Sequence, residues 1–430
     1  MQRIVQKLPV VFVIVAYLVL GYSFFHFIYS YTISIPFADE WGLADMVLDN
    51  KIRLQYFFTQ TSEHRVGTGY LYLQFLSRLT HWKLLYETMS IGVLLLISSF
   101  FALRIKQYFT KSIDYWDAVI PFIFLNLTQE ENLIWGIEIV HILPTFFLLW
   151  TVYLFTKQNS SGKYHLLLCI ALLSAYSHFH GLIVGFIILG YFLLLLIQAF
   201  KKRNGWKKYL YYSVAVAGIL WSYFIGIYPS PYLGPQHMTV AFFFQFVGQQ
   251  INAAIGIQPQ AFYFWVAPFA VAGSLCISMY WYIKKRFDQR YYPIIVLLFY
   301  SLTFILFITF GRSGLGIGAA QTSRYVTYLS PLFFGMYLIG RMHLKGWKIG
   351  IGIVVLILYV YGSMTSRQSS IKQASAKHDE VEQWKNCYLR TESIETCDTQ
   401  TQAVVYYEDI SILKRHLDGL KQQKLNLFSP

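Results

Sequence analysis

The sequence predicts an all-α polytopic membrane protein with about eleven transmembrane helices, within a range of about nine to thirteen. Of its 430 residues, 56% are hydrophobic and only 13% are charged, and its mean hydropathy is +0.45. About a quarter of the residues in a soluble domain are charged, so this composition excludes a water-soluble fold. Apolar stretches that fill a window of about 19 residues recur along most of the chain, and short basic loops separate many of them.

The apolar stretches justify the predicted helices one by one. They cover 9–29, 85–103, 117–128, 139–156, 164–177, 181–199, 209–227, 262–283, 292–310, 325–340 and 349–364. The stretches 117–128 and 164–177 are short for a hydrocarbon layer of about 30 Å, so we expect them to be tilted, broken or re-entrant.

The placement of Lys and Arg predicts the orientation. Short basic loops such as 201–208 and 284–290 lie on the same side as the N-terminus, which indicates a cytoplasmic N-terminus. The first stretch, 9–29, ends in an aromatic belt and lacks a small-residue cleavage site, so we interpret it as a true span and not as a signal peptide. An odd number of spans then puts the C-terminus on the outer side of the membrane. The net charge of +14 is mostly a topology signal, and no nucleic-acid partner is expected.

The sequence predicts a transmembrane domain and two regions outside the bilayer, namely a long first loop and a C-terminal domain. Residues 1–364 form the transmembrane domain, in which 31–84 is a long first periplasmic loop, and 365–430 form a small periplasmic C-terminal domain. We expect amphipathic helices within 42–82 that lie on the bilayer. Their lipid-facing side chains would be Leu43, Met46, Val47, Leu54, Phe57 and Phe58. Cys387 and Cys397 are spaced to close a disulfide in an oxidising compartment, although two unpaired thiols are the alternative.

The first loop carries the carboxylates that the membrane fold does not explain. Asp39 and Glu40 lie beside a hydrocarbon boundary, where the cost of desolvating a charge is high. Two interpretations remain: a general base, or the N-terminal cap of a surface helix that begins at Trp41. The segment Glu63-His64-Arg65 is either a solvated ion pair or a binding element. In the second case Glu63 and His64 would contact acceptor or sugar, and Arg65 a phosphate.

A glycine-rich segment at 311–325 carries the second set of candidates. Arg312 and Arg324 lie at predicted span ends, at the depth of lipid headgroups, where a lipid phosphate would lie. A flexible hairpin between two spans is the alternative. Arg324 is the stronger candidate because Tyr325 and Tyr328 continue a helix face beneath it.

Further polar residues suggest contacts with sugar. Glu130 and Glu131 could bind sugar hydroxyls, or a divalent metal if two loops converge. His178 and His180 have metal-like spacing, but no third ligand is identifiable, so His180 is predicted to hydrogen-bond sugar, backbone or water. The sequence therefore predicts no cofactor and no metal ligand set, and leaves a divalent metal open.

These features point to a donor that is itself in the membrane. The cytoplasmic face has no Gly-rich phosphate loop and no Asp-x-Asp signature, so a nucleotide sugar is not expected there. A polyprenyl-phosphate-linked sugar would need a general base for the acceptor hydroxyl, which Asp39 or Glu40 would supply. It would also need cations for the leaving phosphate, for which Arg65, Arg312 and Arg324 are the candidates.

The layout and several short motifs resemble the GT-C superfamily of polyprenyl-phosphate-sugar glycosyltransferases, and more closely the serotype-converting O-antigen glucosyltransferases. The matching segments are Phe37-Ala38-Asp39-Glu40-Trp41, Glu63-His64-Arg65, Gly311-Arg312-Ser313-Gly314, Ser323-Arg324-Tyr325 and Leu425-Asn426-Leu427-Phe428. The resemblance implies transfer of a sugar, glucose in that family, from undecaprenyl phosphate to an O-antigen or related lipid-linked glycan in the periplasm. It gives the base role to Asp39 or Glu40 without deciding between them.

Two other classes remain open at this level. An O-antigen ligase or polymerase also acts on lipid-linked glycans, but the largest outer loop of those proteins lies late in the chain, whereas here it comes first. A transporter or flippase would show internal repeats and charges near the middle of the bilayer. This sequence shows no repeat, and its charges gather at the span ends.

Overall fold

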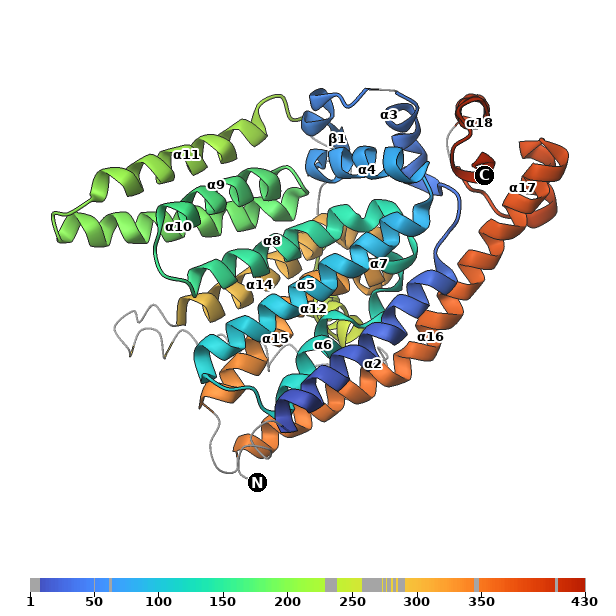
Figure 1. Ribbon diagram of the computed structural model, residues 1–430. Coiled ribbons are helices and arrows are strands. Elements are labelled where there is room, and N and C mark those ends of the chain that lie inside the picture. The colour runs from blue at the N-terminus through green and yellow to red at the C-terminus, as the bar shows by residue number, and fades with distance from the viewer. Residues whose placement is uncertain are drawn as a thin grey trace.

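The computed structural model describes residues 8–49, 51–61, 64–228, 238–256, 291–343, 348–406 and 409–429, with single positions at 273, 276, 280 and 284. The described residues are mainly helical, and the helices pack side by side around a shared apolar core (Figure 1). Two-residue strands β1 (Gln60–Thr61) and β2 (His64–Arg65) form an antiparallel pair in the first loop. The all-α class predicted from the sequence is confirmed for this part of the chain.

The α-helices are α2 (Leu8–Tyr31), α3 (Ala44–Leu48), α4 (Gly67–Thr80), α5 (Leu84–Thr110), α6 (Val119–Phe124), α7 (Glu130–Ile134), α8 (Ile139–Phe155), α9 (Ser161–Ala175), α10 (Phe179–Lys201), α11 (Trp206–Phe224), α12 (Val240–Ile255), α14 (Tyr292–Arg312), α15 (Val326–His343), α16 (Lys348–Thr391), α17 (Ile394–Thr401) and α18 (Ile410–Gln423). Short 3₁₀ turns are η1 (Ala38–Leu43), η2 (Leu54–Phe58), η3 (Tyr115–Ala118), η4 (Leu127–Gln129), η5 (Gly136–Glu138), η8 (Ser313–Leu315), η9 (Ile317–Gln321), η10 (Ser323–Tyr325) and η11 (Asn426–Phe428).

Within the described residues, 5 helical segments are long and apolar enough to cross a membrane, judged by length and composition. They are Leu8–Tyr31, Leu84–Thr110, Gly136–Phe155, Phe179–Lys201 and Tyr292–Leu315. These segments make the chain a multi-pass membrane protein. This number is smaller than the roughly eleven spans that the sequence predicts. The predicted stretch 262–283 lies largely outside the described residues.

The predicted stretch 117–128 is broken, as its length suggested. It is divided among η3, α6 and η4. Helix α6 ends at Phe124, and the side chain of Asn126 accepts a hydrogen bond from the backbone N–H of Thr128 at 3.0 Å. This local bond gives the backbone an alternative to the helix, which explains why an apolar stretch does not become one straight span.

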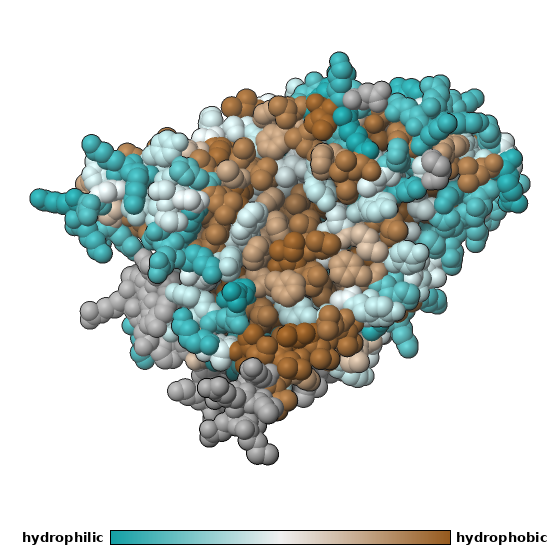
Figure 2. Space-filling model, in the orientation of Figure 1, coloured by the Kyte–Doolittle hydropathy of each residue, from teal (hydrophilic) through white to brown (hydrophobic). Residues whose placement is uncertain are grey.

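The surface agrees with a membrane location. In Figure 2, apolar side chains cover the middle of the visible face, whereas the end formed by the first loop and the C-terminal segment is largely polar. Helix α2 leaves large apolar side chains such as Val11, Leu18 and Val19 more than half exposed. An exposed apolar band of this kind is expected where lipid is the solvent.

The C-terminal segment is packed on the first loop and is not set apart from the rest. The boundary predicted between 364 and 365 falls inside α16, a continuous helix of 44 residues. The backbone N–H of Ala38 donates to the carbonyl of Val405 at 2.8 Å, and that of Asn426 donates to the carbonyl of His81 at 2.9 Å. Both segments therefore lie at the same end of the helix bundle (Figure 1).

The cysteines of the C-terminal segment are bridged in the structure. Cys387 of α16 and Cys397 of α17 form a disulfide with a Cα–Cα distance of 5.6 Å. Both cysteines are buried, so the bridge ties α17 to the end of α16 inside the packed segment.

The expected lipid-facing side chains of the first loop need a correction. Leu43, Met46 and Val47 are buried in the protein, while Leu54 and Phe58 are exposed. Helix α18 contacts α3 and buries its own apolar face there, including Leu413, Leu417 and Leu420. An apolar stripe can be covered by lipid or by another amphipathic helix with the same periodicity, so the sequence pattern alone does not choose between them.

A buried ion-pair network holds the far end of the bundle. Lys106 of α5 is fully buried, with its Nζ 2.6 Å from Asp117 Oδ2 and 2.9 Å from Asp114 Oδ2. Tyr337 of α15 donates to Asp117 Oδ1 at 2.6 Å, and Arg341 reaches Asp114 at 2.6 Å. The network joins α5, η3 and α15 on the side away from the first loop.

Replacing Lys106 by Met should destabilise the protein by about 3–5 kcal/mol, because Asp117 would stay buried without its cationic partner. The measurement is the thermal unfolding midpoint of the purified protein in detergent. Arg104→Met is the matched control, since Arg104 is an exposed cation of the same helix. Equal midpoints for the two variants would contradict this role for Lys106.

Candidate active site

One cavity of about 860 Å³ opens between the first loop, the start of α8, the start of α10, the end of α11 and α14 with the segment that follows it. Its charged and polar lining side chains are Asp39, Thr61, His64, Tyr70, Glu138, His141, His178, His180, Tyr223, Tyr228, Arg312, Thr322, Arg324, Tyr325 and Tyr328. The chain thus gathers distant polar groups in one hollow, while apolar helices surround it.

The adjacent carboxylates at 39 and 40 are separated by the turn that carries them. In η1 the side chain of Asp39 lines the cavity, whereas Glu40 is fully buried, and its Oε1 accepts from the N–H of Ile137 at 3.1 Å. Ala38 starts the turn with φ +47, a left-handed conformation that is unfavourable for alanine. Its hydrogen bond to Val405 holds this conformation, so the C-terminal segment helps direct Asp39 into the cavity.

Glu40 belongs to a buried carboxyl pair that sequence reasoning missed. Glu87 of α5 is fully buried, and its carboxyl group lies beside the same backbone position as that of Glu40. That point is Gly136: a Cβ there would lie 2.2 Å from Glu87 Oε2 and 2.9 Å from Glu40 Oε1. Only glycine fits between the two carboxyls. Burial raises the pKa of Glu40 to about 8, so Glu40 is mostly protonated at neutral pH and is not an ionised base.

The stability of the protein should depend on pH through Glu40. The folded protein keeps this proton up to about pH 8, while an unfolded chain would release it near the ordinary value of 4.5. Between these values the unfolded state binds fewer protons, so the free energy of unfolding should fall as pH rises. Glu40→Gln removes this dependence. Unfolding midpoints of both proteins across this pH window should therefore diverge, with the wild type losing more stability; parallel curves would contradict the assignment.

Two arginines frame the cavity from the ends of the segment after α14. Arg312 ends α14 and lines the cavity, and Arg324 in η10 lines it as well. The Nε of Arg324 is 3.2 Å from Glu131 Oε2, and its Nη1 is 3.3 Å from Glu138 Oε1. The guanidinium also lies over the ring of Trp135, 5.7 Å from its centroid. These contacts fix the direction of Arg324.

Arg65 lies elsewhere. It is buried and outside the cavity lining, and its guanidinium donates to three backbone carbonyls, those of Phe58, Tyr223 and Ile225. These bonds tie the first loop to the end of α11. The predicted phosphate contact of Arg65 is therefore not part of this cavity, because the guanidinium is directed to backbone carbonyls.

Four imidazoles line one wall of the cavity. The ring of His178 lies 4.1 Å from that of His64, 4.7 Å from that of His141 and 5.0 Å from that of His180, between centroids. His141 Nδ1 is 2.9 Å from the hydroxyl of Tyr328, and its Nε2 is 3.4 Å from Glu138 Oε2. Within the described part of the chain, no group of three or more His, Cys, Asp or Glu side chains is arranged to hold a metal ion.

The remaining predicted contacts are placed as follows. Glu131 lies beside the cavity as a partner of Arg324, and Glu130 is buried nearby, where desolvation raises its pKa to about 7. Neither lines the cavity. His64 and His180 do line it, and Glu63 lies outside the described residues.

His141, which lines the cavity, and Glu87, which packs beside Glu40, are two residues that the sequence analysis did not select. Both lie inside apolar helices, where a single polar residue is easily taken for a packing residue. The i, i+3 spacing of Glu138 and His141 was a usable signal, because it puts both side chains on one helix face.

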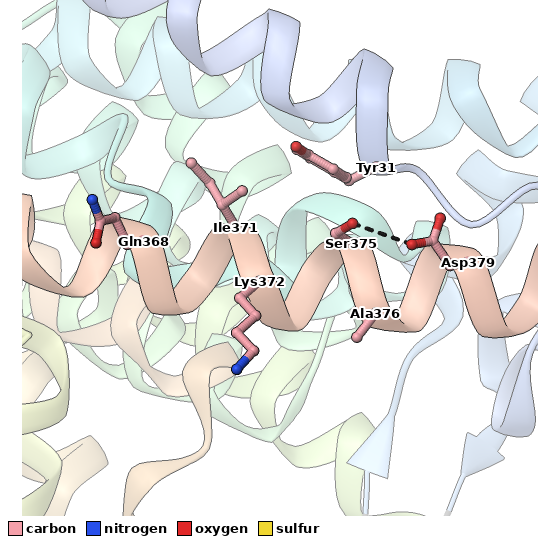
Figure 3. A pocket seen from close by; sticks show the side chains of 7 residues that line it. All are labelled: Tyr31, Gln368, Ile371, Lys372, Ser375, Ala376 and Asp379. Atoms are coloured by element: carbon pink, nitrogen blue, oxygen red, sulfur yellow. Dashed lines mark hydrogen bonds between the residues drawn. The ribbon is translucent and has the colours of Figure 1, made fainter.

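A second hollow of about 430 Å³ lies where α16 passes the end of α2 (Figure 3). Tyr31 covers one side and polar residues of α16, among them Lys372 and Asp379, the other. Ser375 hydrogen-bonds Asp379 at 3.3 Å. The lining of this open groove has one cation and one carboxylate, whereas the cavity that Asp39 lines has two arginines and two carboxylates, so that cavity is the better candidate for the site.

No family model and no curated protein matches the sequence. Among solved structures, the chain is similar to the archaeal oligosaccharyltransferase AglB from Archaeoglobus fulgidus in complex with an inhibitory peptide and a dolichol-phosphate, with a TM-score of 0.48 and 11% sequence identity. The match covers 94% of this chain and 60% of that chain. A likeness at this level carries no conclusion about activity.

Proposed function

We propose that the protein is a membrane glycosyltransferase of the GT-C type, which transfers a sugar from a polyprenyl-phosphate donor to a lipid-linked glycan. The observation that carries the proposal is the cavity that places the carboxylate of Asp39 with Arg312 and Arg324 among apolar helices. Following the sequence resemblance, the donor would be undecaprenyl phosphate glucose and the acceptor an O-antigen repeat of lipopolysaccharide. The site would then face the periplasm from a bacterial inner membrane, with the N-terminus in the cytoplasm and the C-terminus in the periplasm.

Asp39 is the base in this proposal. Its carboxylate takes the proton of an acceptor hydroxyl as that oxygen forms a bond to the anomeric carbon of the sugar. The bond between the anomeric carbon and the phosphate oxygen breaks, and its electron pair leaves with polyprenyl phosphate. The proton remains on Asp39 until water removes it. Glu40 does not take this role, because it is buried away from the cavity and mostly protonated.

The arginines supply the positive charge that the leaving phosphate requires. Arg312 and Arg324 both line the cavity, one at each end of the same segment, so a donor phosphate that binds in the cavity would meet positive charge. Cationic groups held in advance stabilise charge as it develops on a leaving oxygen. Arg324 is held in place by Glu131 and Glu138, which reduces the rearrangement needed when the donor binds.

An apolar track leads to these arginines. Phe307 and Phe310 of α14 line the cavity within the last two turns of the helix before Arg312, and both are almost half exposed. A polyprenyl chain needs such an apolar surface beside a phosphate site. The track and the arginines together fit a lipid phosphate better than a soluble one.

The test is transfer in proteoliposomes. Purified protein should move labelled sugar from a polyprenyl-phosphate hexose to lipid-linked glycan, and cells that express it should carry an O-antigen with an added hexose. Folded protein that transfers no hexose from a panel of such donors would contradict the proposal. Movement of the labelled lipid between leaflets without transfer would instead indicate a transporter.

A further inference from the structure

The start of α10 determines the hydrogen-bonding state of two cavity histidines. His178 is the N-cap of α10, and its Nδ1 accepts from the backbone N–H of His180 at 3.5 Å. An acceptor side chain is favoured at this position, because the first N–H groups of a helix have no partner within the helix. Burial, together with nearby His64, holds the pKa of His178 well below its usual range, so the ring is neutral. Its Nδ1 is therefore the unprotonated nitrogen.

The position of the proton on His178 determines which ring nitrogen of His180 is protonated. The Nδ1 atoms of His178 and His180 are 2.9 Å apart, so one of them must donate to the other. Since His178 Nδ1 is an acceptor, His180 Nδ1 carries the proton. In a neutral imidazole the other nitrogen then has a free lone pair. The Nε2 of His180 is therefore a hydrogen-bond acceptor.

This acceptor has no donor in the described part of the protein. His180 is 2% exposed, it lines the cavity, and its Nε2 is a buried atom without a hydrogen-bond partner among the described residues. Its ring lies 4.7 Å from that of Phe304 and 4.9 Å from that of Tyr328, between centroids. The hydroxyl of Tyr328 is directed to His141 at 2.9 Å. Because buried polar atoms are normally hydrogen-bonded, the missing donor points to a ligand.

We propose that His180 is a specificity-determining residue that accepts a hydrogen bond from one hydroxyl of the transferred sugar. The flat aromatic wall of Phe304 and Tyr328 suits the apolar face of a pyranose, and the lone pair at its edge suits a hydroxyl. The phosphate of the same donor would be held by Arg312, which lines the same cavity. This inference depends on the proposed function, and it adds which group of the sugar the site recognises.

The experiment uses deoxy donors. The full-length protein in proteoliposomes is first offered polyprenyl-phosphate glucose, galactose and mannose, and then the monodeoxy forms of the sugar that it transfers best. For the wild type, one monodeoxy donor should lose at least about tenfold in kcat/KM, because a polar site rejects an analogue that leaves its buried group unpaired.

Three variants identify the residue responsible. His180→Phe keeps a planar ring but has no lone pair, so it should transfer the parent sugar less well and lose most of the discrimination against that deoxy donor. His180→Gln keeps an acceptor oxygen and should retain part of the discrimination. His26→Phe is the matched control, because His26 is an exposed histidine of α2 outside the cavity lining. Its loss should change neither the transfer of the parent sugar nor the discrimination against the deoxy donor.

Different results would overturn the proposed function and the role of His180. A wild type that transfers none of the three sugars would overturn the proposed function, and this inference with it. A wild type that transfers sugar while His180→Phe discriminates among the deoxy donors as the wild type does would overturn only the role of His180.

Discussion

Replacing Asp39 by Asn should lower kcat for sugar transfer by roughly 10²–10⁴-fold, the range that a general base contributes. The amide cannot accept the proton of the acceptor hydroxyl, yet it has nearly the same shape as the carboxylate. Because Asp39 is exposed to the cavity, the change should leave the folded state intact. The measurement is the initial rate of transfer from a labelled polyprenyl-phosphate sugar in proteoliposomes, with the thermal unfolding midpoint as a check on folding.

Glu40→Gln is the matched control for this variant. It changes the neighbouring carboxylate to the same kind of amide, but Glu40 is buried and outside the cavity lining. Its amide oxygen can still accept from the N–H of Ile137, as Oε1 of Glu40 does. We expect transfer close to the wild-type rate. The opposite pattern, an active Asp39→Asn protein and an inactive but folded Glu40→Gln protein, would reverse the assignment of the base.

Replacing Arg324 by Ala should reduce both stability and transfer. The side chain of Glu138 is 1% exposed, and its Oε1 lies 3.3 Å from Nη1 of Arg324. The variant therefore leaves a buried carboxylate without its cation. Removing one partner of such a pair costs about 3–5 kcal/mol. Loss of a charge that stabilises the leaving phosphate should lower kcat by a further factor of about 10²–10³. Unfolding midpoints and transfer rates measure the two effects.

A second substitution separates the two effects. In the double variant Arg324→Ala, Glu138→Gln the buried carboxylate is replaced by a neutral amide, so most of the lost stability should return. The transfer rate should stay low, because the phosphate would still lack this arginine. Full recovery of transfer in the double variant would show that Arg324 only holds the fold.

The helices were largely predictable, because each depends on a local pattern. The stretches 9–29, 85–103, 139–156, 181–199 and 292–310 coincide with the segments that are long and apolar enough to span a membrane. Apolar residues over a full bilayer thickness leave few alternatives to a helix, since the backbone must satisfy its own hydrogen bonds in lipid. Cys387 and Cys397 are close in the sequence, with a separation of 10, and they form the predicted disulfide in the structure.

The candidate site was predictable in part. Asp39, Arg312 and Arg324 were selected because charges beside a membrane are costly, and all three line one cavity. The same rule also selected Glu40 and Arg65, which lie outside the lining because other parts of the chain use them. A high desolvation cost identifies a charged residue that must have a partner, but it does not say whether that partner is a substrate or the protein itself.

The sequence by itself determined that this protein is a bundle of apolar helices with its unusual charges near the ends of those helices. Composition and periodicity are properties of single segments, and they need no knowledge of neighbours. Only the tertiary structure decided which of two adjacent carboxylates reaches the cavity. The strained turn at Ala38, held by Val405 from the other end of the chain, turns Asp39 toward the cavity and Glu40 toward Glu87. That choice depends on contacts between segments far apart in the sequence, which no local pattern contains.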